Sequence, residues 1–154
     1  MKNSKIKTNK KSLELLFSKA GLFASDQEAL SNWAKYLCVC VYGYLENSFT
    51  ELLASYASKR AQQPIANFVR AKLDEIWKWD EERLLAAICK FDGNLRVELE
   101  RKADPKFFSS LNSVTTNRNK ISHGESVNIT LAQITTYFSD VNSLLDLLEK
   151  ELGL

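Results

Sequence analysis

Turn-forming residues are scarce in this sequence, which contains two prolines and five glycines among its 154 residues. A fold built from many short strands needs frequent turns, so this scarcity argues against an all-β architecture and favours long helices. Long apolar runs are also missing, because the longest, "YLCVCVYGYL" at residues 36–45, is far short of the roughly 20 residues that span a bilayer. We therefore expect no membrane association.

Cysteine and histidine are equally sparse, with three cysteines and a single histidine. An odd number of cysteines in apolar surroundings indicates a reducing compartment such as the cytoplasm, and not a disulfide framework. Cys38 and Cys40 would lie ~200° apart on a helix and so would not converge on a metal ion. The sequence also lacks a glycine-rich phosphate-binding loop. We therefore expect neither a metal site nor a cofactor.

Acidic residues are absent from the first eleven residues, "MKNSKIKTNKK", which carry five of the 21 basic side chains. The other 143 residues hold 16 basic and 19 acidic side chains. This asymmetry predicts a basic, disordered tail over residues 1–11 that either keeps the chain soluble or holds nucleic acid weakly. Residues 12–154 are expected to form a single domain that is large enough to bury a core. Because that domain is slightly acidic, any RNA binding must depend on a local site.

Helix caps and apolar periodicity predict an all-α fold, a bundle of about six to seven helices. Gly21 is expected to end the first helix, and Ser25 with Glu28 forms a capping box for the second. The middle of the second helix is apolar all round, which is typical of a central, buried helix. The expected helices cover approximately residues 12–21, 25–59, 64–79, 81–91, 94–102, 105–124 and 130–148.

The helix expected at residues 105–124 carries a cation on its apolar face. This face follows steps of four and three residues and consists of Phe107, Leu111, Val114, Arg118 and Ile121. These positions fall within about 80° of arc, with Arg118 near the centre. A guanidinium in that place needs a carboxylate, a phosphate or a subunit interface as its partner. Glu46 in the second helix is one candidate, either in a purely structural pair or as a carboxylate that orients a catalytic arginine.

His123, the only histidine, lies near the end of the same helix. It shares a face with Asn119, four residues earlier, but points ~140° away from Arg118. Three arrangements would still bring the arginine and the histidine together. The arginine reaches round, the helix unwinds at Gly124, or two copies of the chain meet across a two-fold axis. A histidine at this position also suits a purely local role beside the helix C-terminus.

The stretch "RNKISHG" at residues 118–124 resembles the signature of HEPN domains, an arginine and a polar residue followed closely by a histidine. The wider pattern resembles the RiboL-PSP-HEPN branch. In that branch a helix of the type "CVCVYGYLENSFTELLASYA" precedes the motif, and "HG" is followed by a final helix that starts at Ser or Thr. Relatives often have alanine where this chain has Ser122, a small change that should not disable the site. The resemblance covers most of the chain after about residue 25.

This resemblance implies an all-α bundle, frequently a homodimer, whose active members are metal-independent endoribonucleases. Arg118 and His123 match the catalytic pair, Asn119 matches the polar position, and Glu46 matches, more loosely, a supporting acidic position. The chemistry suits these residue types, because RNA carries its own nucleophile in the 2′-hydroxyl group. Histidine, with an unperturbed pKa of ~6.5, moves protons near neutral pH. The forked cation of arginine stabilises charge on the phosphorane oxygens.

The resemblance favours RNA and a second copy of the chain as partners. It also favours a role as a toxin or defence effector, with an antitoxin or regulatory protein as a further partner. Two other functions stay open: a non-catalytic HEPN-like module that binds a nucleotide or a protein, and a plain helical interaction domain. The intact Arg-x4-His pattern favours the nuclease, whereas the slightly acidic domain favours the binding module, because capture of RNA benefits from positive potential.

Overall fold

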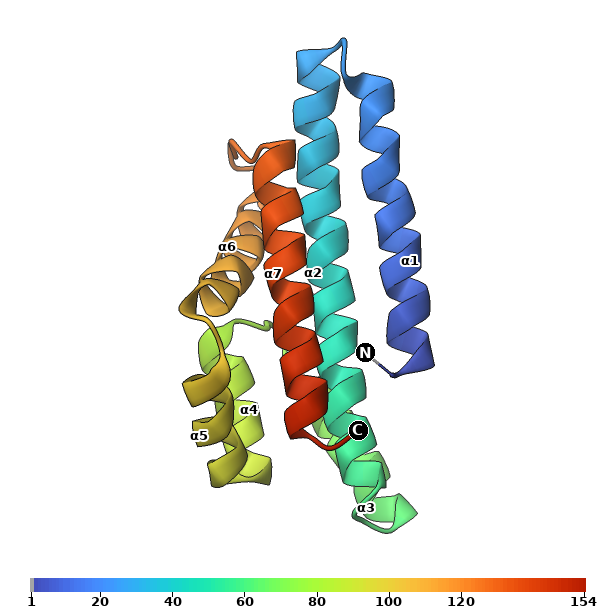
Figure 1. Cartoon of the computed structure of the whole chain (residues 1–154), viewed down its shortest axis with the longest axis vertical. Coiled ribbons are helices and arrows are strands. Elements are labelled where there is room, and N and C mark those ends of the chain that lie inside the picture. The colour runs from blue at the N-terminus through green and yellow to red at the C-terminus, as the bar shows by residue number, and fades with distance from the viewer. Residues whose placement is uncertain (1) are drawn as a thin grey trace.

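The computed structural model describes residues 2–154 and is all-α over that range, as the sequence predicts (Figure 1). Its elements are α1 (Ser4–Ser18), the 3₁₀ helix η1 (Lys19–Phe23), α2 (Gln27–Ser58), α3 (Gln63–Asp74), α4 (Glu81–Phe91), α5 (Gly93–Lys102), α6 (Pro105–Ser122) and α7 (Leu131–Glu151). The long helix α2 lies in the middle, with α1 and α7 along it. The short helices α4 and α5 form a pair on the side away from α1 (Figure 1).

The central position of α2 follows from its apolar residues, which surround the helix. The fully buried ones are Ala34, Leu37, Cys38, Val41, Leu45, Phe49, Leu52 and Leu53. Helices α1, α3, α6 and α7 all pack against α2 and cover these side chains. The prediction of a buried central helix is confirmed. No helix within residues 2–154, α2 included, combines the length and the apolar character that a membrane span requires.

Helix α6 begins and ends close to the residues that the sequence predicts, and α7 begins where expected but continues to Glu151, three residues beyond the expected end. Asp104 caps α6, Pro105 occupies its first turn, and Gly124 follows its end in the left-handed conformation with φ of +71°. Thr130 and Gln133 form a reciprocal capping box at the start of α7. The two helices pack against each other along their apolar faces. The site motif, at the C-terminal end of α6, therefore lies on a well-anchored helix.

The connection between α1 and α2 differs from the sequence-based expectation. Gly21 does not end a helix in the left-handed conformation, because α1 ends at Ser18 and the chain tightens into η1. The N-cap of α2 is Asp26, whose carboxylate accepts the Ala29 N–H at 2.9 Å, and not Ser25. Aspartate is as good an N-cap as serine, so the sequence offered two adjacent candidates.

The N-terminal segment also differs from the expected disordered tail, because α1 starts at Ser4. The side chain of Asn3 caps the helix, and Ile6 is only 1% exposed. The buried carboxylate of Glu149 in α7 accepts the backbone N–H groups of Lys2, at 2.7 and 2.8 Å, and of Asn3, at 2.9 Å. These contacts bring residues 4–11 into α1 although their charge pattern suggests a solvated tail.

The segment 75–80 joins α3 to α4 and does not continue the helix, although the sequence predicts a helix as far as residue 79. Trp79 is 1% exposed and packs on Phe49 of α2, with 5.5 Å between the ring centroids. The backbone N–H of Trp79 donates to the Tyr42 hydroxyl at 3.0 Å, and the backbone carbonyl of Trp79 accepts the Thr115 hydroxyl at 2.7 Å. These bonds replace those of a further helical turn and fasten the segment to α2 and α6.

Candidate functional site

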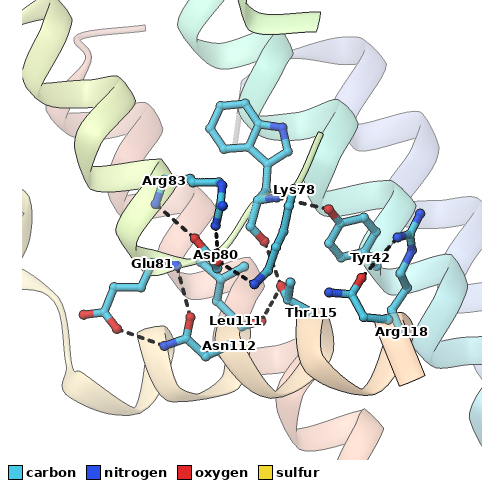
Figure 2. A network of polar contacts seen from close by, with 11 residues as sticks. Tyr42, Lys78, Asp80, Glu81, Arg83, Leu111, Asn112, Thr115 and Arg118 are labelled. Carbon is cyan, nitrogen blue, oxygen red and sulfur yellow. Dashed lines mark hydrogen bonds and ion pairs between the residues drawn. The ribbon is translucent and has the colours of Figure 1, made fainter. Parts of the chain in front are cut away.

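Arg118 lies on the core-facing side of α6, where the apolar stripe predicts it. Leu111 and Val114 of that stripe are fully buried, and Arg118 is half-buried. The guanidinium carbon lies 4.6 Å from the centroid of the Tyr42 ring, and Nη1 donates to the Asn119 side-chain oxygen at 3.2 Å (Figure 2). Both partners are neutral. Within residues 2–154, no carboxylate forms an ion pair with this guanidinium.

Tyr42 supports the arginine from α2 and is itself held by the segment 75–80. Burial raises the pKa of Tyr42, whereas the hydrogen bond from the Trp79 N–H and the charge of Arg118 lower it and the charge of Glu46 raises it further. The net shift is upward, so the phenol stays neutral at neutral pH. A neutral ring attracts the guanidinium through its π face without cancelling its charge. Arg118 is therefore fixed in place but remains a full cation.

The start of α4 ties α6 to the segment 75–80 through a second set of polar contacts (Figure 2). Asn112 of α6 accepts the Glu81 N–H at 3.1 Å and donates to the Glu81 carboxylate at 2.9 Å. Asp80 pairs with Lys78 and Arg83, each at 2.9 Å. Burial acts to raise the pKa of Asp80, but the Arg83 N–H and the Lys78 ammonium outweigh it and lower that pKa. The carboxylate is therefore charged at neutral pH and holds both cations beside the site.

Glu46 does not form the ion pair with Arg118 that the sequence left open, as no such pair exists among residues 2–154. It lies one helical turn beyond Tyr42, is half-buried, and lines a hollow of about 180 Å³ with Asn47 and Arg70. Its charge nevertheless acts on the same phenol as Arg118, in the opposite direction. Arg118 thus lies against the Tyr42 ring while Glu46 follows one turn further along α2, and the two charged residues make no direct contact.

His123 occupies the C-cap of α6. Its backbone N–H bonds to the carbonyls of Asn119 and Lys120, at 3.1 Å each, and its side chain is exposed. No hydrogen bond or ion pair within residues 2–154 involves the imidazole, so none joins it to Arg118. The five-residue spacing turns the two side chains ~140° apart. A single chain therefore presents a supported cation and an accessible imidazole in different directions.

Tyr42 is the site residue that sequence reasoning missed, together with the segment that fixes it. A signal was present, because Tyr42 precedes Glu46 by four residues and therefore shares its helix face. Trp79 gave no comparable signal, since its role depends on backbone bonds to two distant helices. Chemically, the arrangement offers a guanidinium that is held by neutral groups, a suitable partner for a phosphate.

The chain belongs to the RiboL-PSP-HEPN family, whose family model matches residues 4–153. This match confirms the HEPN domain that the motif at the end of α6 indicates, and it includes most of the N-terminal segment that was expected to be a tail. No curated protein and no solved structure gave a significant match.

Proposed function

We propose that this protein is a metal-independent endoribonuclease in which Arg118 and His123 are the catalytic residues. The observation that carries the proposal is the environment of Arg118, which is half-buried on α6 and held by an aromatic face and an amide. No carboxylate among residues 2–154 is bound to it. Such a cation is free to bind a phosphate. The only histidine follows five residues later with its imidazole accessible to solvent.

In the proposed reaction, the 2′-hydroxyl oxygen of one nucleotide attacks the adjacent phosphorus, and the bond from phosphorus to the 5′-oxygen of the next nucleotide breaks. A neutral His123 accepts the proton of the 2′-hydroxyl, and a protonated His123 donates a proton to the departing 5′-oxygen. Arg118 stabilises the negative charge that develops on the non-bridging oxygens. The products are a 2′,3′-cyclic phosphate and a 5′-hydroxyl end.

A homodimer is part of this proposal, because the directions of Arg118 and His123 in one chain suit one phosphate poorly. In an isologous dimer the same patch of both chains meets at the axis, so each arginine is able to approach the partner's histidine. Each such pair forms one site, in which the histidine first accepts the 2′-hydroxyl proton and then returns it to the departing 5′-oxygen. Asn119 and Glu46 are positioning residues in this scheme, acting on Arg118 directly and on Tyr42 electrostatically.

The proposed biological role is that of a toxin or defence effector. An active ribonuclease threatens the RNA of its own cell, so an antitoxin or other regulatory protein is the further partner that we propose. RNA is the proposed substrate partner.

Cleavage in the absence of divalent metal tests the proposed activity. We expect mixed RNAs to be cut by the purified protein in excess EDTA, because Arg118 supplies the charge that a metal would otherwise provide. The measurement is the chemistry of the new ends, with 2′,3′-cyclic phosphates as the expected product and His123→Ala protein as the control. Cleavage that depends on added Mg²⁺, or equal cleavage by His123→Ala protein, would contradict the mechanism.

Mixing two inactive variants tests the shared cleft. We expect Arg118→Ala and His123→Ala proteins, inactive alone, to regain activity after subunit exchange, because a mixed dimer contains one site with an intact arginine and an intact histidine. If half of the dimers are mixed, recovery should reach about a quarter of the wild-type rate. No recovery would place both residues of a site in one chain. A protein that is strictly monomeric at micromolar concentration yet active would rule out the dimer.

A further inference from the structure

A groove of about 600 Å³ lies between α3 and α4, beside the segment 75–80. Its lining includes three aromatic and three basic residues, Phe68, Trp77, Phe91, Lys72, Arg83 and Lys90. Glu75 is the one acidic residue of this lining. We call this feature the α3–α4 groove. Its positive balance contrasts with the slight acidic excess of residues 12–154 as a whole.

Two of the three aromatic rings of the α3–α4 groove are open to solvent, whereas Phe91 packs on the core. Trp77 is 71% exposed and Phe68 is 61% exposed, whereas Trp79, two residues beyond Trp77, is 1% exposed. The segment 75–80 therefore places one tryptophan in the core and another on the surface of the groove. Large rings that gather on the surface of a chain with a well-filled core mark a binding surface.

The cations of the groove are interleaved with these rings. The guanidinium carbon of Arg83 lies 4.6 Å from the centroid of the Trp77 ring, and Asp80 holds Arg83 there through an ion pair of 2.9 Å. The Lys72 ammonium lies 5.8 Å from the Phe68 centroid and forms an ion pair with Glu75 at 2.8 Å. The Lys90 ammonium makes no hydrogen bond or ion pair within residues 2–154.

Alternating rings and cations match a single nucleic-acid strand. Bases stack on exposed aromatic faces, and backbone phosphates pair with nearby lysine and arginine side chains. An apolar helix of a protein partner would satisfy the rings of Phe68 and Trp77 but would leave Lys90 without a counter-charge. A duplex would satisfy the cations but not the rings, because its bases are already stacked on one another.

The groove lies next to the candidate active site along the chain. Trp77 and Trp79 are two residues apart, so their Cα atoms are separated by at most ~7 Å. The backbone of Trp79 is bonded to Tyr42 and to Thr115 of α6, one turn before Arg118 (Figure 2). A strand that occupies the groove therefore has a short path to Arg118.

We propose that the α3–α4 groove binds single-stranded RNA beside the bond that is cut, with bases stacked on Trp77 and Phe68 and a phosphate paired with Lys90. The choice of RNA as the ligand rests on the proposed ribonuclease function. The groove thus selects unpaired RNA and positions it, while Arg118 and His123 act on the phosphate.

The test measures binding of a fluorescent, unstructured RNA oligonucleotide to the full-length protein carrying His123→Ala, so that binding is read without cleavage. In this background we expect Trp77→Ala to weaken binding about 5- to 100-fold, the range typical of a lost base–aromatic stack. Trp77→Phe should stay within about threefold, because phenylalanine keeps a stacking face. Leu15→Ala is the matched control, since Leu15 is 65% exposed on α1, away from α4 and α5 (Figure 1).

Lys90→Gln provides an independent readout, because loss of one phosphate contact should reduce the slope of log affinity against log salt by about 0.7. Equal binding by the Trp77→Ala and Leu15→Ala proteins would overturn the groove proposal, while cleavage by the wild-type protein would leave the ribonuclease function standing. A Trp77→Ala change that alters the oligomeric mass but not RNA affinity would make the groove a protein interface and also overturn the proposal. Trp77-dependent binding without any cleavage by wild type would support the groove and reject the ribonuclease.

Discussion

Replacement of His123 by alanine is expected to lower the rate of RNA cleavage by about 10²- to 10⁴-fold, the usual loss when a positioned proton carrier is removed. The imidazole is exposed and makes no polar contact within residues 2–154, so its loss should change the free energy of unfolding by no more than ~0.5 kcal/mol. The measurements are single-turnover cleavage and urea unfolding of the same preparations. Asn128→Ala, at an exposed position in the following loop, is the control and should retain full activity.

Arg118 variants separate charge from geometry in the same assays. Arg118→Ala should lose most of the activity, and Arg118→Lys should recover little of it, because an ammonium keeps the charge but not the fork that binds two oxygens. Tyr42→Phe keeps the ring beneath the guanidinium but removes the hydroxyl that accepts the Trp79 backbone N–H. This variant therefore separates the effect of the aromatic face from that of the hydrogen bond. A His123→Ala or Arg118→Ala protein that cuts RNA at the wild-type rate would show that the motif serves only the structure.

Removal of residues 2–11 is expected to lower the free energy of unfolding of the domain by ~2–5 kcal/mol or more. This range is the usual cost of losing one large buried aliphatic side chain. The deletion takes away Ile6, which is 1% exposed, and the three hydrogen bonds that Glu149 accepts from Lys2 and Asn3. Chemical unfolding of the deleted and intact proteins measures the difference. This expectation reverses the one drawn from the basic composition alone.

Two single substitutions show whether buried apolar surface or charge in residues 2–11 is responsible for the loss of stability. Ile6→Ala should account for much of the loss, whereas Lys7→Ala, at the adjacent exposed position, should stay within ~0.5 kcal/mol of wild type. If the truncated protein unfolds at the same denaturant concentration as the intact one, the first helix contributes nothing to stability and residues 2–11 are a tail after all.

The parts of the fold that the sequence predicted well are those whose determinants are local. Caps such as Asp104 and the Thr130–Gln133 box act within one helical turn, so the bounds of α6 and the start of α7 were predictable. The same holds for the position of Arg118, because helical periodicity alone places it on the apolar stripe. Its side chain is indeed half-buried against α2.

The features that escaped prediction depend on contacts between distant residues. The helical state of residues 4–11 rests on Glu149, and the non-helical state of residues 75–80 rests on Tyr42 and Thr115. Local propensity does not reveal such partners, because a short stretch of sequence is compatible with either a helix or an irregular segment. The support of Arg118 by Tyr42 lies between these cases: spacing along α2 brings Tyr42 close to Glu46, but only packing of α6 on α2 selects the ring as the partner.

The clamp between Glu149 and the N-terminal backbone also sets an order of events during synthesis. Lys2 and Glu149 are 147 positions apart in the chain, and the Lys2 ammonium additionally donates to the carbonyl of Leu154 at 3.0 Å. Lys2 and Asn3 thus acquire these partners only after Glu149 has been translated. Arg118 and His123 are translated before Glu149. A nascent chain therefore carries the complete motif before the hydrogen bonds between Glu149 and the start of α1 are able to form.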